Sequence, residues 1–292
     1  MTPSITDVAG VEVGHWTDDT ALTGCTVITF PVANTTAGEI RGGFPAAREF
    51  STLASGMNTG AVDAVVFAGG SSRGLAAAEG VVEGLAADGR GELAPGGPVL
   101  PTVAGAVVWD LGVGASTAFP GVPEGRAAYE DRSATPGWGA VGAGVGATVA
   151  KWRGAGATVA GGVGSSSVAV GDAVVGALAV VNAVGDVFSL TGEPLTEGPP
   201  VPALFPAHEF GARQNTTLVA VATDAAMSRD ALLRLLVRVH DAFGACLRPA
   251  HTRWDGDAAL AVSCGDVEVH PDAVGEAAFV ATAQAIEAAV RR

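Results

Sequence analysis

One short segment of the chain joins a nucleophilic residue to the start of an apolar run. Thr216 follows Asn215 and precedes the run 218–222, which is typical of a buried strand. The Thr216 hydroxyl could attack the Asn215 carbonyl, take over the acyl group and, after hydrolysis, become a new N-terminus. That residue would carry a nucleophile and its own base, since a free α-amine has a pKa of about 7.7–8.0. An Asn-Thr pair before a strand is also an ordinary turn.

Four further polar residues could support a nucleophilic threonine. Lys151 is the only lysine of the chain and follows a glycine-rich segment, although it could also be an ordinary surface residue. Asn182 is an amide inside an apolar run, suited either to an oxyanion hole or to pairing with nearby backbone. Asp255 and Asp257 stand two apart just ahead of a predicted strand, where they can orient a hydroxyl or an ammonium group or form a solvated turn.

Nucleotide and metal sites fit the sequence poorly. The segment 142–147 loosely matches the dinucleotide pattern, but no acidic residue stands out about 20 positions later, and Lys151 is followed by Trp152 rather than by the Ser or Thr of a phosphate-binding loop. The histidines show no metal-ligand spacing, and the three cysteines indicate neither a disulfide framework nor a zinc site; these residues are His15, His208, His240, His251, His270, Cys25, Cys246 and Cys264. We therefore expect no metal and no cofactor.

Composition narrows the class of protein. The 292 residues are 48% hydrophobic and carry a formal net charge of −14, which suits a large folded core and disfavours nucleic acid or an anionic membrane as partner. The longest apolar run, 173–181, is far too short to span a bilayer. The N-terminus lacks the basic start and apolar core of a secretory signal. We expect a cytoplasmic protein.

Strand and helix patterns alternate along the chain and predict an α/β or α+β class. Residues 188–213 are proline-rich and irregular, and we predict a mobile connector there. A helix should begin near Ser228, and Pro271 should open the last helix. Strands are predicted at 11–14, 25–30, 62–68, 99–113 (with a turn near Trp109), 165–187, 216–223 and 258–263, and another helix at 71–87.

Ordered landmarks along almost the whole chain resemble the DmpA family of self-processing aminopeptidases and amidases. These landmarks lie at 5–15, 23–27, 41–43, 69–75, 109–112, 146–148, 181–186 and 214–224. Within the family, the threonine at the nucleophile position, the lysine and the Asp-x-Asp pair resemble the NylC branch of nylon-oligomer (6-aminohexanoate oligomer) hydrolases. Trp109 departs from the pattern, because the family has a tyrosine there, and indole lacks an ionisable hydroxyl.

The resemblance implies a fold and a site. The fold would be an αββα two-sheet sandwich like that of N-terminal-nucleophile hydrolases, here a single domain, 1–292. Cleavage between Asn215 and Thr216 would give an α fragment, 1–215, and a β fragment, 216–292. The roles implied are nucleophile for Thr216, neighbouring cation for Lys151, oxyanion donor for Asn182, and positioning carboxylates for Asp255 and Asp257. We also place Trp109, Ser71 and Ser72 at the substrate pocket.

The expected activity is hydrolysis of an amide bond in a small molecule or short peptide, without a cofactor. The expected oligomeric state is a homotetramer. Two alternatives stay open from the sequence. A self-cleaving threonine acyltransferase would use the same precursor chemistry and pass the acyl group to an amine. A non-catalytic binding or assembly protein could keep the fold without being processed.

Overall fold

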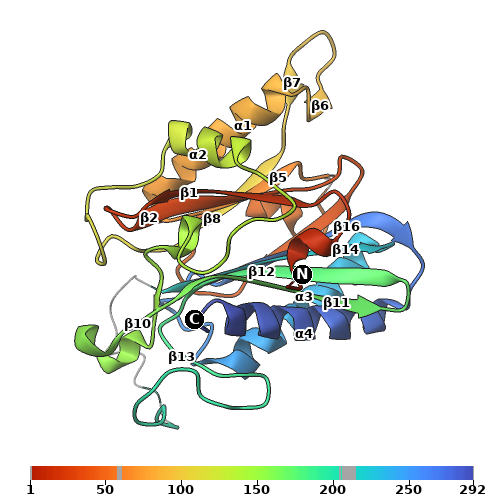
Figure 1. Cartoon of the computed structure of the whole chain (residues 1–292). Coiled ribbons are helices and arrows are strands. Elements are labelled where there is room, and N and C mark those ends of the chain that lie inside the picture. Colours follow the sequence, from red (N-terminus) through yellow and green to blue (C-terminus); the bar gives the residue numbers. More distant parts are fainter. Residues whose placement is uncertain (1, 58–60, 204, 206–214, 292) are drawn as a thin grey trace.

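The computed structural model describes residues 2–57, 61–203, 205 and 215–291. Two five-stranded sheets lie face to face, and a pair of helices covers the outer face of each (Figure 1). This is the αββα sandwich that the resemblance implied, and the predicted fold class is confirmed.

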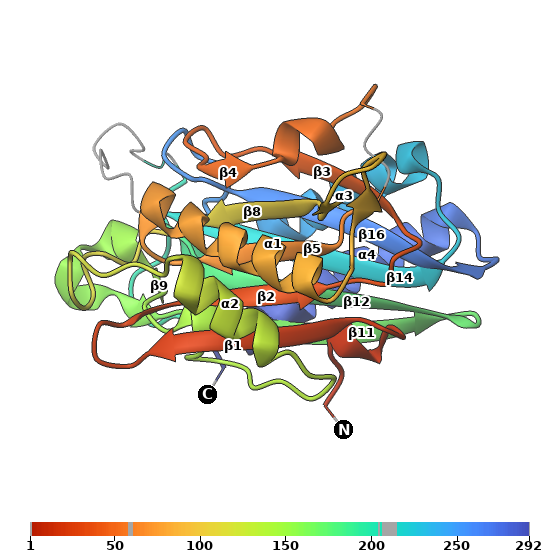
Figure 2. The ribbon, with the colours of Figure 1, turned by 90° about the horizontal axis from the view of Figure 1, so that it is seen from above.

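The first sheet has the strand order β1-β2-β5-β8-β4. β5 and β8 run parallel, whereas the other neighbours are antiparallel. Helices α1 (Ala77–Ala87) and α2 (Val122–Glu130) lie over its outer face (Figure 2). Its strands are β1 (Glu12–Asp18), β2 (Thr23–Thr29), β4 (Ala47–Arg48), β5 (Ala64–Ala68) and β8 (Val103–Val107).

The second sheet has the order β11-β12-β14-β16-β3. Here β14 and β16 are parallel and the other neighbours antiparallel. Helices α3 (Arg229–Cys246) and α4 (Pro271–Ala288) cover its outer face. Its strands are β3 (Thr35–Ile40), β11 (Gly162–Val170), β12 (Ala173–Asn182), β14 (Thr216–Ala225) and β16 (Ala258–Val267).

Short elements complete the described chain. The two-residue strands outside the two large sheets are β6 (Glu92–Leu93), β7 (Val99–Leu100), β9 (Thr148–Val149), β10 (Val159–Ala160), β13 (Asp186–Val187) and β15 (Leu247–Arg248). The 3-10 helices are η1 (Ile5–Asp7), η2 (Phe50–Leu53), η3 (Ser71–Ala76), η4 (Gly142–Gly144), η5 (Lys151–Arg153) and η6 (Ala155–Ala157).

Three apolar clusters hold the layers together. The central one lies between the sheets and includes Leu218 and Leu260, both fully buried. A second lies between the β11–β3 sheet and helices α3 and α4, and a third between the β1–β4 sheet and helices α1 and α2. Strands such as β14 are therefore apolar on both faces, which explains their unbroken apolar runs.

Most predicted elements are present. Ser228 caps α3 by accepting the Ala231 N–H, and Pro271 opens α4. The predicted helix 71–87 begins as η3 and continues as α1, and the long run 165–187 divides into the antiparallel pair β11–β12. Strand β3 and helix α2 were not predicted. Of the predicted connector, residues 204 and 206–213 lie outside the described residues. Within the described part of the chain, no helix has the length and apolarity needed to cross a membrane.

Candidate active site

The candidate residues meet at one edge of the β11–β3 sheet. Thr216 is the first residue of β14 and pairs with Asn182, the last residue of the antiparallel strand β12. Asn215 forms a parallel bridge with Asp255, directly ahead of β16. Because parallel strands begin at the same edge and an antiparallel neighbour ends there, three distant sequence segments are brought together.

The Thr216 hydroxyl lies beside the peptide bond proposed to break. In the uncut chain, Thr216 Oγ1 donates a hydrogen bond to the Asn215 carbonyl oxygen at 2.5 Å. The Gly256 backbone N–H donates to the same oxygen at 2.9 Å. A Cβ atom on Gly256 would lie 2.6 Å from Thr216 Oγ1. A glycine at this position lets the backbone approach both the hydroxyl and the carbonyl.

The two aspartates flank this peptide and are both buried. Asp257 Oδ1 accepts the Thr217 backbone N–H at 2.7 Å, and Asp255 Oδ2 accepts that of Thr252 at 2.7 Å. Burial, and after it the negative charge of Asp257, raises the pKa of Asp255 to about 7. The pair therefore has one carboxyl group that can exchange a proton near neutral pH.

Lys151 and Asn182 lie next to each other on the other side of Thr216. Lys151, which opens η5, directs its ammonium group to the backbone oxygen and to Oδ1 of Asn182, at 2.7 Å in both cases. Asn182 Oδ1 also accepts the Thr148 N–H, and its amide donates to the Trp109 carbonyl oxygen. Burial lowers the pKa of Lys151 to about 7, against the opposite effect of Asp255 and Asp257.

A cavity of about 380 Å³ opens onto Thr216. All three residues predicted for the substrate pocket line it: Ser71, Ser72 and Trp109. Ser71 has a left-handed backbone (φ 56°) and donates its N–H to the Val108 carbonyl oxygen. The lining residues are Phe44, Pro45, Ala46, Ser71, Ser72, Val107, Val108, Trp109, Asn215 and Thr216.

The segment 41–44, which ends at the cavity-lining Phe44, holds the aspartate loop. Arg41 and Gly42 donate their N–H groups to the Asp257 carbonyl oxygen, both at 3.0 Å, and Phe44 donates to that of Asp255 at 2.8 Å. A Cβ atom on Gly42 would lie 2.3 Å from the Asp255 carbonyl oxygen. This contact explains the glycine at position 42, and a Cβ atom on Gly43 would lie 2.6 Å from the Cα atom of Arg253.

Two contributors were missed from the sequence. Gly256 was regarded only as part of a turn, and His251 was considered only as a metal ligand. In the structure His251 contacts Asp257 through two hydrogen bonds. No pattern marks either role, since each depends on which loop meets which strand; the only signal is that His251 precedes Asp257 by six residues.

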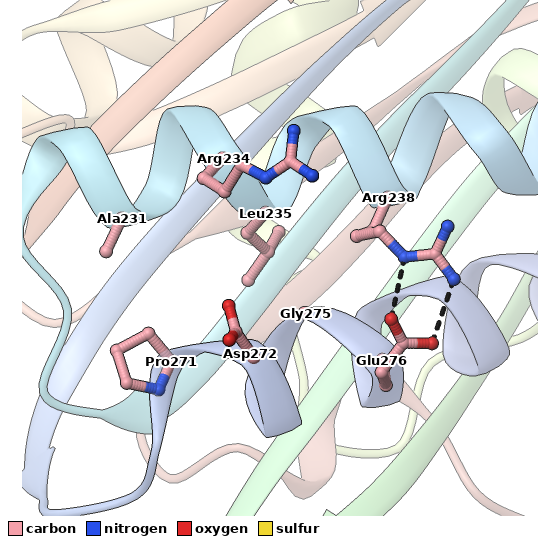
Figure 3. Close-up of a pocket in the computed structure, with 8 residues that line it drawn as sticks. All are labelled: Ala231, Arg234, Leu235, Arg238, Pro271, Asp272, Gly275 and Glu276. Atoms are coloured by element: carbon pink, nitrogen blue, oxygen red, sulfur yellow. Dashed lines mark hydrogen bonds and ion pairs between the residues drawn. The ribbon is translucent and has the colours of Figure 1, made fainter.

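A second cavity, of about 390 Å³, lies between α3 and α4 on the outer side of the sheet (Figure 3). Arg238 spans it and binds Glu276 through two hydrogen bonds, at 2.9 and 2.8 Å. Its lining residues are Ala231, Arg234, Leu235, Arg238, Pro271, Asp272, Gly275 and Glu276. None of the predicted site residues is among them, and the ion pair links the two helices.

Comparison with known proteins places this geometry in context. The profile of peptidase family S58 matches residues 3–292. An uncharacterised aminopeptidase of Mycobacterium tuberculosis is 38% identical over 98% of this chain and 88% of its own length. The 6-aminohexanoate-oligomer endohydrolase of Paenarthrobacter ureafaciens is 30% identical over 90% of this chain and 75% of its own.

Solved structures share the fold at lower identity. A β-aminopeptidase of a Burkholderia species superposes with a TM-score of 0.72 at 21% identity, over 99% of this chain and 85% of that one. The L-aminopeptidase D-Ala-esterase/amidase of Ochrobactrum anthropi, described as a variant of the Ntn-hydrolase fold, gives a TM-score of 0.73 at 20% identity, over 98% of this chain and 85% of that one.

Proposed function

This chain belongs to peptidase family S58 and is a hydrolase of amide or peptide bonds, and from that premise we propose that it processes itself and uses Thr216 as its nucleophile. The single observation that carries the proposal is the position of the Thr216 hydroxyl, 2.5 Å from the Asn215 carbonyl oxygen that also accepts the Gly256 N–H. An attacking group and an oxyanion donor thus meet at one peptide bond.

In the processing step, Thr216 Oγ1 attacks the carbonyl carbon of Asn215. Neutral Lys151, whose pKa burial lowers to about 7, receives the hydroxyl proton. The Gly256 N–H stabilises the tetrahedral oxyanion. The C–N bond then breaks, the proton passes to the Thr216 nitrogen, and an ester joins the two segments. Water hydrolyses this ester and leaves a carboxylate on Asn215 and a free amine on Thr216.

In turnover, the freed α-amine of Thr216 serves as the base for its own hydroxyl. The hydroxyl attacks the substrate amide carbonyl, the amine part leaves with the proton, and water hydrolyses the acyl-threonine ester. Asn182 supplies its side-chain amide to the substrate oxyanion, a contribution of about 2.7–4 kcal/mol in comparable sites. When it is protonated, Lys151 lowers the pKa of this amine, and Asp255 and Asp257 balance and position the amine.

The substrate enters the cavity beside Thr216. Among the residues described in its lining, no side chain carries a formal charge, and two serines provide hydroxyl groups. Such a wall suits an uncharged acyl chain with hydrogen-bonding amides. The name of one relative, a 6-aminohexanoate-oligomer endohydrolase, fits this class. We propose short peptides or ω-amino-acid oligomers as substrates.

Intact mass of the purified protein under denaturing conditions tests the mechanism. Wild-type protein should separate into fragments 1–215 and 216–292, whereas Thr216→Ala should keep one chain. Thr217→Ala is the matched control, because Thr217 is also a buried hydroxyl residue at the start of β14. It should still be processed. An intact wild-type chain after long incubation would refute self-processing.

A further inference from the structure

The carboxylate of Asp257 is held on one side by the backbone of β14 and on the other by a histidine. Its Oδ1 accepts the Thr217 N–H at 2.7 Å. Its Oδ2 accepts two hydrogen bonds from His251, one from the backbone N–H at 2.9 Å and one from ring Nδ1 at 2.8 Å. With three donors on two oxygens, the plane of this carboxylate is fixed.

His251 is itself held by a second imidazole. His240, on α3, places its Nδ1 at 3.1 Å from His251 Nε2. The two rings meet edge to face with centroids 4.9 Å apart. Phe243 packs against both, with centroid distances of 5.2 Å to His240 and 5.1 Å to His251. The side chain of His240 is only 1% exposed.

The hydrogen bond between the His251 ring and Asp257 has a defined direction. Asp257 Oδ2 also accepts the His251 backbone N–H, so the ring Nδ1 that faces this oxygen carries the proton. Burial lowers the pKa of His240 to about 3, and the charges of His251 and Arg41 act in the same sense, so His240 is neutral at pH 7. Its Nε2 lies 3.8 Å from the Glu39 carboxylate, beyond hydrogen-bond distance.

The backbone of His251 is held in an unusual conformation. Its φ of 56° lies in the left-handed region, which costs a residue other than glycine about 1–3 kcal/mol and tends to persist where function requires it. In this conformation the backbone N–H and the ring Nδ1 reach the same oxygen of Asp257.

We propose that His251 is a positioning residue of the active site, held by His240, and that it orients Asp257 toward the first strand of the β fragment. This inference rests on the proposed function, because Asp257 is one of its two site carboxylates. Neither His240 nor His251 lines the cavity beside Thr216; the pair acts through Asp257. Loss of the Nδ1 donor should therefore turn the carboxylate and slow acyl transfer without unfolding the chain.

The first test needs no activity. Nitrogen-15 NMR of the imidazoles in Thr216→Ala, which keeps the chain uncut, should show a proton on Nδ1 of His251. The Thr217 amide should exchange slowly with solvent, because Asp257 accepts its proton. An Nε2–H tautomer at His251, or a rapidly exchanging Thr217 amide, would overturn the proposal.

The second test compares two variants that tolerate the left-handed backbone equally well. In the His251→Asn variant, the side-chain amide places an N–H where Nδ1 was. In the His251→Asp variant, a second carboxylate faces Asp257. We expect His251→Asp to slow processing about 100-fold, as a displacement of about 1 Å can do, and His251→Asn to stay within about 10-fold of wild type. Equal losses in both variants would contradict a donor role.

His270→Asp is the control for adding a carboxylate in place of a histidine. His270 is 74% exposed and caps α4 by accepting the Asp272 N–H, a position that aspartate fills well, so processing should be unchanged. If wild-type protein is not processed at all, the proposed function fails, whereas the NMR measurement still decides whether His251 holds Asp257.

Discussion

At the scale of single residues, the proposed chemistry depends on the backbone coming very close to a hydroxyl group. Gly256 donates to the carbonyl that Thr216 would attack, and its missing side chain leaves room for Thr216 Oγ1. Asp255 and Asp257, on either side of this glycine, supply the charges. The Asp-Gly-Asp sequence therefore combines one oxyanion donor with two carboxylates in three residues.

The Gly256→Ala variant should block processing. A Cβ atom there would lie 2.6 Å from Thr216 Oγ1, so the hydroxyl must move by enough to cost about 100-fold or more in rate. Gly244→Ala is the matched control, since a Cβ atom on this helical glycine meets nothing within 4 Å, and it should add up to about 1 kcal/mol of stability. Intact mass measured over time gives the fraction of uncut chain in each variant. Equal processing rates in Gly256→Ala and Gly244→Ala would contradict the role of Gly256.

The Asp255→Asn variant should change how stability depends on pH. The pKa of Asp255 is raised from an ordinary value of 3.8 to about 7, so folding favours its neutral form. Its contribution to stability is complete below pH of about 4 and is lost as pH rises through about 7. Asparagine does not titrate, so the stability of the variant should rise relative to that of its parent between pH 5 and pH 8, by about 3 kcal/mol at most.

Chemical unfolding at the two pH values, in the Thr216→Ala background so that every chain is uncut, measures this difference. Asp266→Asn removes an exposed carboxylate from the far end of β16. Its unfolding free energy should differ from that of its parent by the same amount at both pH values. If the difference in unfolding free energy between Asp255→Asn and its parent were the same at both pH values, folding would not raise the pKa of Asp255.

The sequence, chiefly through its family resemblance, proposed a set of site residues but not their contacts. The hydroxyl, the lone lysine, the strand amide and the Asp-x-Asp pair stand out by type, and the structure brings all of them to one sheet edge; their catalytic roles stay predictions. Ser71, Ser72 and Trp109 line the adjoining cavity. The part played by His240 was not predictable, because α3 brings it to His251 only through packing around Phe243.

At the scale of elements, apolar runs with clear ends were predictable, and short or interrupted ones were not. β3 has only six residues, of which two are threonines and one is glycine, so no apolar alternation marks it. α2 contains Pro123 and Gly125, which weaken a helical pattern. Gly125 is required by packing, since a Cβ atom there would lie 1.9 Å from the Ala77 carbonyl oxygen of α1.

The edge that carries the site also follows from element order. β14 and β16 are parallel and are joined through α3, the crossover arrangement that places strand starts at one edge. β12 reaches the same edge at its end, where the polar Asn182 closes its apolar run. The strand that carries the proposed nucleophile is therefore paired on both sides in the uncut chain.

At the scale of the whole molecule, the proposed cut divides the chain without dividing the core. The β fragment would contribute β14, β16, α3 and α4, and the α fragment would contribute β11, β12, β3 and the whole first sheet. β12 pairs with β14 along eight residues, Asn182–Val175 against Thr216–Thr223. Leu218, Val219 and Val221 are buried on the two faces of β14, and each adds about 1.5–3 kcal/mol relative to exposure.

The two fragments should therefore remain one particle after processing. Size-exclusion chromatography with light scattering under native conditions should give a single species whose mass is a multiple of 28.7 kDa, while the same sample shows two chains when denatured. Uncut Thr216→Ala should elute at the same volume, because the cut lies at the edge of the sheet and not within it. The multiple also tests the predicted tetramer. Separate elution of fragments 1–215 and 216–292 would mean that strand pairing and burial around β14 do not hold the core together once the Asn215–Thr216 bond is gone.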